Sequence, residues 1–187
     1  MIERFFPDMY VKKVEDINFD NLKNKGIKGM ILDIDNTLID YYKNIRESTI
    51  EWIDTAKKND IKVYLVSNNS KERVNEIANK LSLKYVFHAA KPLKKGLVQA
   101  MNEMDINNTE VAVVGDQIFT DVYGGNRLNM LTILVEQISI KDIFVTKLKR
   151  PLEKYVLNRY NERSTEQDTK KASWKQKSAN AKGVCKK

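Results

Sequence analysis

The chain has 187 residues, 42% hydrophobic and 31% charged, with a formal net charge of +8. This length and composition suit one globular domain with a sizeable core. No apolar run approaches the roughly 18 residues of a membrane-spanning helix. The single cysteine, Cys185, excludes an internal disulfide and a cysteine metal cluster, which favours a reducing, cytoplasmic location. Glu3 and Asp8 interrupt the N-terminal sequence, so we expect no signal peptide.

The positive charge is concentrated at the C-terminal end. Residues 147–187 contain 13 Lys/Arg and 4 Asp/Glu, a balance of +9, whereas the other 146 residues contain 20 and 21, a balance of −1. From Ser164 onward aliphatic residues are few and show no periodicity, which predicts a folded domain over 1–163 and a disordered basic tail over 164–187. Such a tail can attract the phosphates of nucleic acid or of an anionic membrane. The alternative is a solubilising extension without a partner.

Apolar strands and amphipathic helices alternate along the chain from residue 27. Strands are predicted at Ile27–Asp33, Lys62–Ser67, Lys84–Ala89, Glu110–Asp116 and Leu131–Glu136, and helices at Asn44–Asn59, Ser70–Ser82, Leu93–Met104 and Leu152–Tyr160. Continuous Val/Ile/Leu strands joined by helices predict an α/β fold, a doubly wound parallel sheet covered on both faces. The functional site of such a sheet lies beyond the carboxyl ends of its strands.

Polar side chains follow the predicted strands at that edge. The first strand ends in Asp33 and Asp35, the second in Ser67, Asn68 and Asn69, and the fourth in Asp116, with Asp121 five residues later; Lys91 follows the third strand. Because parallel strands end at one edge of the sheet, we expect these residues to converge although they are distant in sequence.

The converging residue types indicate phosphoryl transfer. Asp33 and Asp116 can share Mg²⁺, which prefers carboxylates, water and phosphate oxygens. A carboxylate can then attack phosphorus to form an aspartyl-phosphate, while Asp35 protonates the leaving oxygen and later activates water. Ser67 or Asn68 can donate a hydrogen bond to a phosphoryl oxygen. Lys91 can offset the phosphoryl charge.

Four short motifs resemble those of a known family. The sequence "DIDNT", Asp33–Thr37, resembles the DxDxT signature of the haloacid dehalogenase-like (HAD) phosphatases, and "VSN", "KP" and "GDQIFTD" resemble that superfamily's second, third and fourth motifs, in order. More narrowly, "DIDNTL", "SNN", "KP" and "GDQIFTDVYGGNRLNMLTILV" resemble the YqeG subfamily of HAD class IIIA. The similarity runs from about Phe5 to Tyr160 and implies a Rossmann-like HAD fold.

The resemblance implies a role for each matching acid. Asp33 matches the nucleophile, and Asp35 matches the general acid/base, which also gives the metal a backbone carbonyl. Asp116 matches the remaining metal carboxylate. The implied metal ligands are therefore Asp33, Asp35 and Asp116, with Mg²⁺ as cofactor.

The remaining motif residues are implied to bind phosphate or to support the site. Ser67 matches the phosphate-binding hydroxyl, with Asn68 beside it, and Lys91 matches the charge-stabilising lysine. Asp121 matches the second acid of the fourth motif, which supports the metal or orients Lys91. Thr37 matches the motif-one threonine, a supporting hydrogen bonder.

Each of these residues also has a structural interpretation. The first two acids and Asp116 can be turn or N-cap residues, and Ser67 or Asp121 can cap a helix. Lys94 and Lys95 compete with Lys91, which we favour because it directly precedes Pro92.

Two further features are interpreted as structural. His88 falls in the predicted third strand, and Gly124–Arg127 reads as a tight passage from helix to strand. The alternative for the second feature is that Asn126 and Arg127 contact substrate.

The motif spacings predict a site without a cap domain. Asp33 and Ser67 are 34 residues apart, and Ser67 and Lys91 are 24 apart, so neither interval holds a folded cap of ordinary size. An open rim admits a phosphate carried on a large molecule. Capless members of the resembled family tend to act on macromolecules or on headgroups at a membrane.

Three functions follow from these observations. The YqeG resemblance implies a mitochondrial relative that dephosphorylates phosphatidylglycerophosphate, and residues 1–14 and 143–160 mix apolar and basic side chains as at a membrane interface. The protein would then work peripherally at the inner face of the membrane; alternatively, such segments cover the sheet edges. The other hypotheses are a phosphatase of a phosphoprotein or nucleic acid end, and a non-enzymatic module that binds RNA or a ribosomal particle.

Overall fold

A computed structural model describes residues 2–139 and 151–163. Of the described residues, 2–139 belong to one compact unit, and a helix over 151–163, predicted at Leu152–Tyr160, belongs to a second unit. None of the helices in these described ranges has the length and apolarity of a membrane span. The predicted tail, and the first part of the amphipathic segment 143–160, lie outside the described residues. The domain boundary at 163 stays a prediction.

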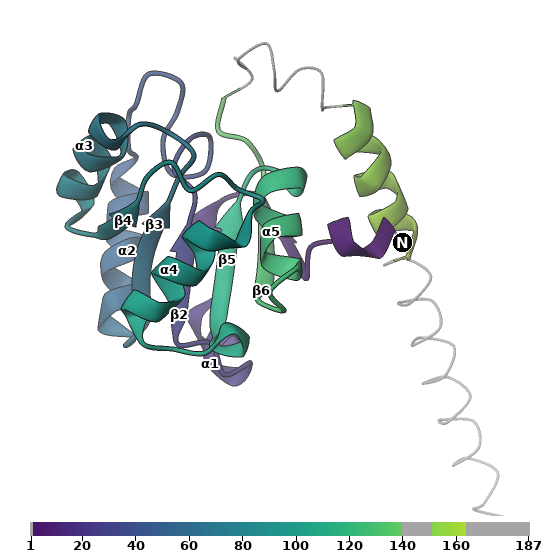
Figure 1. The fold of residues 1–187 in the computed structure, drawn as a ribbon, viewed down its shortest axis with the longest axis horizontal. Coiled ribbons are helices and arrows are strands. Elements are labelled where there is room, and N and C mark those ends of the chain that lie inside the picture. Colours follow the sequence, from purple (N-terminus) through teal and green to yellow (C-terminus); the bar gives the residue numbers. More distant parts are fainter. Residues whose placement is uncertain (1, 140–150, 164–187) are drawn as a thin grey trace, which may run out of the picture. The chain divides into compact units, whose positions relative to one another are not determined.

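Six parallel strands form the sheet at the centre of the first unit (Figure 1). They are β1 (Met9–Val11), β2 (Gly29–Leu32), β3 (Lys62–Val66), β4 (Lys84–Val86), β5 (Val111–Gly115) and β6 (Leu131–Val135), in the spatial order β1-β6-β5-β2-β3-β4. The predicted doubly wound parallel sheet is confirmed. Because β2 lies between β5 and β3, the residues that follow these three strands become neighbours.

Helices cover both faces of the sheet, as Figure 1 shows for α2 and α4. One core contains side chains from α1 (Phe19–Asn24), α2 (Glu47–Lys58) and α3 (Lys71–Leu81), and the other contains side chains from α4 (Lys94–Met104). The short α5 (Tyr123–Asn126) and the helical turns η1 (Ile2–Phe5), η2 (Val14–Asp16), η3 (Asn108–Glu110) and η4 (Ile118–Val122) complete the unit.

The central strand shows why the strands read as continuous apolar runs. Met30 and Leu32 pack into one core together with Ile53, whereas Ile31 points to the opposite core with Leu97. Successive side chains of a strand alternate between faces, so a strand covered on both sides must be apolar at every position. All four residues of β2 are accordingly buried.

The N-terminal segment covers an edge of the sheet, as one of the two sequence interpretations expected. β1, which the sequence pattern did not predict, pairs with β6 through Met9 and Ile133. The ring of Phe5 packs 5.3 Å from that of Phe119 and 4.8 Å from that of Tyr123. Three residues between polar neighbours are too few for a periodic signal, so tertiary pairing decides this strand.

The third predicted strand is shorter than expected. β4 ends at Val86 rather than Ala89, and the placement of His88 inside a strand is wrong. His88 has a φ of 43°, outside the β region, and its backbone N–H donates to the carbonyl of Asn69 at 3.0 Å. The chain therefore turns back toward the end of β3.

No cap domain is inserted among residues 33–91, all of which the structure describes. The first interval holds a loop, α2 and β3, and the second holds α3 and β4. The helix expected from Asn44 begins at Glu47 because Asp40 binds both the backbone N–H and the side-chain amide of Asn44 and closes a turn there.

Glu15 of η2 forms hydrogen bonds with the N-terminal turn of α2. Its carboxylate accepts hydrogen bonds from Thr49 at 2.7 Å and Ser48 at 3.0 Å, and lies 3.4 Å from the Arg46 guanidinium. Burial alone would raise the pKa of Glu15, but the hydrogen bonds, led by that from Thr49, outweigh it and hold the pKa below the ordinary value of 4.5. The folded state therefore favours the ionised form.

We expect Glu15→Gln to lower the free energy of unfolding at neutral pH by about 1 kcal/mol, since a charge-assisted hydrogen bond is replaced by a neutral one. A lowered folded pKa contributes stability above pH 4.5 that is lost as the pH falls through the folded value. The difference from wild type should therefore vanish in acid. Urea unfolding at several pH values measures this difference, with Glu51→Gln, at an exposed position of α2, as control. A difference that persists in acid contradicts the account.

Candidate active site

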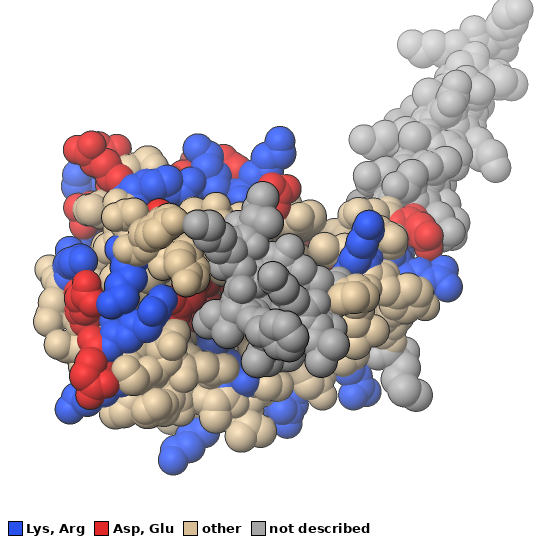
Figure 2. Space-filling model, turned by 90° about the horizontal axis from the view of Figure 1, so that it is seen from above, with Lys and Arg blue, Asp and Glu red and all other residues tan. Residues whose placement is uncertain are grey.

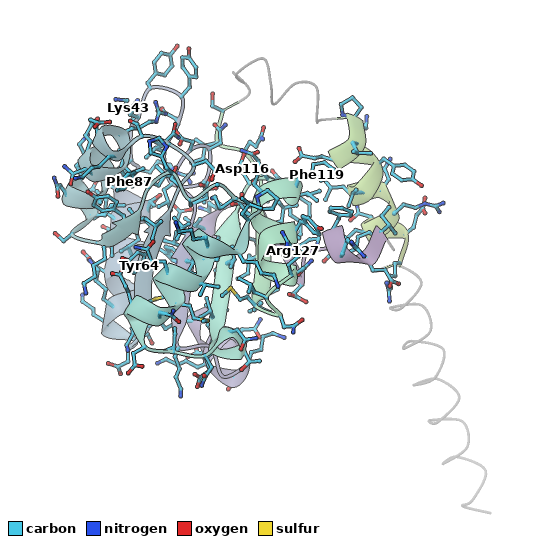
Figure 3. All side chains as sticks on the ribbon, in the orientation of Figure 1. Lys43, Tyr64, Phe87, Asp116, Phe119 and Arg127 are labelled. Carbon is cyan, nitrogen blue, oxygen red and sulfur yellow. The ribbon has the colours of Figure 1, made fainter. Side chains whose placement is uncertain are left out.

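The predicted site residues meet at the carboxyl edge of the sheet, which Figure 2 views from above, with acidic side chains beside Lys and Arg. Asp33 follows β2, and its backbone N–H donates to the carbonyl of Val114 in β5 at 2.9 Å. This pairing brings Asp33 beside Asp116, the residue that follows β5. Figure 3 labels Asp116 at this end of the sheet.

A buried ion-pair network forms the centre of the site. The Nζ atom of Lys91 lies 2.6 Å from Asp33 Oδ1 and 2.6 Å from Asp121 Oδ1. All three side chains are buried, whereas Lys94 and Lys95 are exposed. Lys91 is thus the lysine that the fold brings into the site.

Asp116 completes a cluster of three acids. One carboxylate oxygen from each of Asp33, Asp116 and Asp121 lies within 4.8 Å of the others. Asp116 Oδ2 accepts a hydrogen bond from Gln137 at 2.9 Å. Its Oδ1 is buried and has no hydrogen-bond partner among the described residues.

Burial shapes the acid–base properties of this cluster. Burial raises the pKa of Asp33 to about 7, against the opposing effect of the Lys91 charge. Burial, reinforced by the charges of Asp33 and Asp121, also raises the pKa of Asp116 well above its ordinary value. For Lys91, burial would lower the pKa, but the two adjacent carboxylates outweigh it and the pKa lies above its ordinary value.

These residues fit a divalent cation. Three carboxylates against one ammonium leave an excess of negative charge in a buried place, which is costly unless something offsets it. The unpartnered Oδ1 of Asp116 is a ligand atom that a cation would satisfy. A set made of oxygen donors suits a hard ion such as Mg²⁺ rather than a soft transition metal.

The local backbone explains how Asp121 reaches the cluster. In η4 the N–H of Val122 donates to the carbonyl of Gln117 five residues back, a wide turn that directs Asp121 inward. Asp121 Oδ2 accepts from the Gln117 N–H at 3.3 Å and from Thr120 Oγ1 at 3.2 Å. Asp121 therefore closes its own turn and also pairs with Lys91, while its supporting role in catalysis stays a prediction.

Gly115 provides the space for that carboxylate. A Cβ atom at this position would lie 2.3 Å from Asp121 Cγ and 2.4 Å from its Oδ2. No non-hydrogen atoms approach so closely without displacement. Glycine is thus required at the end of β5 for Asp121 to reach Lys91.

Ser67 and Asn68 occupy the end of β3. Ser67 Oγ lines the cleft and accepts from the Asn69 N–H at 3.2 Å, so it does not cap α3. The Asn68 amide bridges the backbone of Lys91, accepting from its N–H at 2.7 Å and donating to its carbonyl at 3.1 Å. This contact gives Asn68 a part in placing Lys91, while the phosphate-binding roles of both residues stay predictions.

Asp35 lies outside the three-acid cluster. Its Oδ1 accepts from Arg73 Nε at 3.0 Å and also from Arg73 Nη2, and its Oδ2 accepts from Asn69 Nδ2. The sequence motifs predict no role for Asn69 or Arg73. The available signal was their position, immediately after β3 and in the first turn of α3.

Three other predicted positions have defined surroundings. Thr37 Oγ1 is buried without a hydrogen-bond partner among the described residues, so its supporting role stays a prediction. Asn126 donates to the carbonyls of Arg4 and Phe6, and Arg127 donates to that of Pro92. These contacts agree with a structural passage through α5 into β6.

A cleft of about 450 Å³ opens above the cluster. It is lined by Asp33, Asp35, Asn36, Asp40, Tyr41, Ser67, Asn68, Asn69, Arg73, Lys91, Gln117 and Thr120. At its rim the exposed ring of Tyr41 meets that of Tyr42 edge-on at 5.4 Å. The site therefore combines buried carboxylates, the buried ammonium of Lys91 and exposed aromatic rings at the edge of the cleft.

Comparison with known proteins identifies the family. A family model described as haloacid dehalogenase-like hydrolase matches residues 41–129. The chain is 38% identical over 160 residues to the "Probable phosphatase YqeG" of Bacillus subtilis (strain 168), covering 84% of this chain and 93% of that protein. The chain belongs to the haloacid dehalogenase-like hydrolases. Within this family it is a phosphatase, and the predicted resemblance to the family is confirmed.

Two more distant proteins match this HAD phosphatase. It is 28% identical over 166 residues to "Phosphatidylglycerophosphate phosphatase 1, chloroplastic/mitochondrial" of Arabidopsis thaliana; the match covers 82% of the chain and about half, 47%, of that protein. An uncharacterized Listeria monocytogenes protein of known structure aligns with a TM-score of 0.50 and 17% identity, over 63% of this chain and 86% of that one. The last match supports the fold alone.

The Gly115–Asp121 contact can be tested with a double-mutant cycle. Gly115→Ala should lower the free energy of unfolding by about 1–3 kcal/mol, the usual cost of overpacking, and should reduce phosphatase activity because Asp121 is pushed from Lys91. In an Asp121→Gly background the three nearest side-chain atoms, Cγ, Oδ2 and Cβ of Asp121, are absent, so the same change should cost under about 1 kcal/mol. Equal costs in both backgrounds would show that another contact is responsible.

Proposed function

We propose that this HAD phosphatase is a Mg²⁺-dependent phosphomonoester hydrolase that works through an aspartyl-phosphate on Asp33, with phosphatidylglycerophosphate as substrate. One observation carries the chemistry. The Asp33 carboxylate is held by Lys91 and lies within the reach of one cation from Asp116, at the base of a cleft.

The metal would be held by Asp33 and Asp116, with the backbone carbonyl of Asp35 as the family resemblance implies. Bound Mg²⁺ supplies charge neutralisation and polarises a phosphoryl oxygen. The remaining contribution comes from the protein's own groups. Lys91 and Ser67 line the same cleft and are suited to bind the phosphoryl oxygens and offset their charge in the transition state.

In the first step an Asp33 oxygen forms a bond to phosphorus as the bond between phosphorus and the alcohol oxygen breaks. Asp35 gives its proton to that leaving oxygen, and the alcohol departs. In the second step Asp35 takes a proton from water, whose oxygen bonds to phosphorus. The bond between phosphorus and Asp33 then breaks, which releases phosphate and restores the Asp33 carboxylate.

Three observations support a lipid substrate. The Arabidopsis relative is named as a phosphatidylglycerophosphate phosphatase. No cap domain is inserted in the chain between residues 33 and 91, all of which the structure describes. The exposed Tyr41 and Tyr42 at the rim have the aromatic, half-polar character that favours a membrane interface. We infer that the enzyme reaches its substrate from the cytoplasmic side of a membrane, as a peripheral protein.

Magnesium should stabilise the enzyme more as the pH rises. Without a cation, the raised pKa of Asp33, about 7 against an ordinary 3.8, means that the folded protein keeps a proton that the unfolded chain has lost, so this group costs stability as the pH rises between these values. Bound Mg²⁺ would remove that cost. Thermal unfolding with MgCl₂ or with EDTA, at about pH 5 and about pH 8, measures the gain from the cation.

Asp116→Asn should largely abolish this Mg²⁺-dependent gain, because it removes a ligand charge while leaving the side-chain shape. Exposed Asp54→Asn on α2 is the matched control and should keep the gain. A gain of wild-type size in Asp116→Asn would contradict the cation site.

The lipid substrate can be tested by phosphate release from phosphatidylglycerophosphate in mixed micelles with Mg²⁺. We expect kcat/KM to exceed that for soluble glycerol 3-phosphate by about tenfold or more, because binding of the remote lipid part contributes to transition-state stabilisation. Asp33→Asn should reduce both to background.

The same assay separates the alternatives. Faster release from a phosphopeptide or from a nucleic acid 3′-phosphate than from the lipid would replace the lipid substrate by that class. No release from any phosphate, by a folded protein that binds Mg²⁺, would favour the non-enzymatic module.

A further inference from the structure

The carboxylate of Asp35 is held by groups that the proposed chemistry does not use. We propose that Arg73 and Asn69 are positioning residues that fix Asp35 for proton transfer to the leaving oxygen. This inference rests on the proposed function, in which Asp35 is the general acid.

The contacts come from a single short segment of the chain. Arg73 lies in the first turn of α3 and presents two nitrogens, Nε at 3.0 Å and Nη2, to Asp35 Oδ1. Asn69, between β3 and α3, donates to Oδ2. A guanidinium that meets a carboxylate through two nitrogens constrains its position more than a single-point lysine contact does.

Asp35 needs such a constraint because nothing else in the site supplies it. Its side chain is 29% exposed, unlike the 9% of Asp33, and it is not one of the three clustered acids. In the described residues, the hydrogen bonds of its carboxylate are those from Arg73 and Asn69. A general acid must stay within about 2.6–3.2 Å of the atom that it protonates, so a carboxylate without these contacts would spend most of its time misplaced.

The segment also explains how Asp35 is aligned with the phosphate. Ser67 begins the same β3–α3 connection and lines the cleft together with Asn69 and Arg73. Because β3 pairs directly with β2, the connection after β3 and the Asp33–Asp35 turn are fixed relative to each other. One continuous backbone segment thereby carries both the proposed phosphate-binding hydroxyl of Ser67 and the two residues, Asn69 and Arg73, that position the general acid.

If Arg73 and Asn69 position Asp35, the loss of rate on removing them should depend on the leaving group of the substrate. An alkyl phosphate releases a strongly basic alkoxide unless its oxygen is protonated, whereas p-nitrophenyl phosphate releases a phenolate that leaves without a proton. Loss of positioning at Asp35 should therefore slow formation of the aspartyl-phosphate from alkyl phosphates and largely spare its formation from the aryl phosphate. The second step, in which Asp35 activates water, is the same for all these substrates, so the difference is expected in kcat/KM, which reports the first step. A purely structural role for Arg73 would affect both substrates alike.

The test measures kcat and KM for Arg73→Ala, Asn69→Ala and Asp35→Asn with p-nitrophenyl phosphate and with two alkyl phosphates, glycerol 3-phosphate and phosphatidylglycerophosphate. We expect Arg73→Ala to lower kcat/KM, which reports the first step, by about 10–100-fold for the two alkyl phosphates and by less than about threefold for the aryl phosphate. Asn69→Ala should show the same pattern more weakly. Arg73→Lys, which keeps the charge but not the two-nitrogen contact, should recover only part of the loss.

Lys71→Ala is the matched control, since it removes the same charge from the same turn of α3, where Lys71 lies 5.9 Å from the ring centroid of Phe87. It should keep the wild-type ratio of alkyl to aryl rates. Thermal unfolding of each variant separates loss of folding from loss of positioning. The Arg73 side chain is one-third exposed, so its removal should leave the fold intact. Asn69→Ala tests the positioning of Asp35 independently of Arg73.

The inference is overturned if Arg73→Ala lowers kcat/KM for alkyl and aryl phosphates equally, because Arg73 would then act on phosphate binding rather than on Asp35. It is also overturned if Arg73→Ala raises kcat, because the contact would then hold Asp35 in an unproductive position. The proposed function fails separately, if wild type hydrolyses no phosphate or if Asp35→Asn itself shows no dependence on the leaving group.

Discussion

The buried ammonium of Lys91, held between the carboxylates of Asp33 and Asp121, is the interaction on which the rest of the site depends. Burying charges is expensive, so each group persists there only because its partner is present with good geometry. Several local features serve this contact. Asn68 fixes the Lys91 backbone, and the absence of a side chain at Gly115 admits Asp121. The pairing leaves an excess of negative charge, which makes the same place suitable for a cation.

The order of strands makes that contact geometrically possible. β2 lies at the centre, and its neighbours β3 and β5 end at the same edge, so residues separated by tens of positions meet without a long loop. The two buried faces of the sheet hold the strand ends rigidly, which gives the catalytic groups of this HAD phosphatase fixed positions. The described connections between residues 33 and 91 insert no cap domain beside the cleft, in keeping with the proposed phosphate on a large molecule.

Two kinds of acid therefore occupy neighbouring positions with different surroundings. Asp33 is buried beside Lys91 and suited to charge neutralisation and attack on phosphorus, whereas Asp35 is partly exposed and held by Arg73. A single residue, Ile34, separates them, but their partners come from different strand ends, β4 for Lys91 and β3 for Arg73. In the proposed mechanism, this difference in partners allows one carboxylate to bond to phosphorus while the other moves protons.

The sequence by itself determined the parallel α/β sheet and the position of Asp33, Ser67 and Asp116 at strand ends, because continuous apolar runs between helices have few other solutions. It did not determine β1, which is too short for periodicity. Nor did it determine which lysine enters the site, or that Arg73 and Asn69 bind Asp35. Those choices depend on side-chain direction and on contacts between distant segments, and only the tertiary structure sets them.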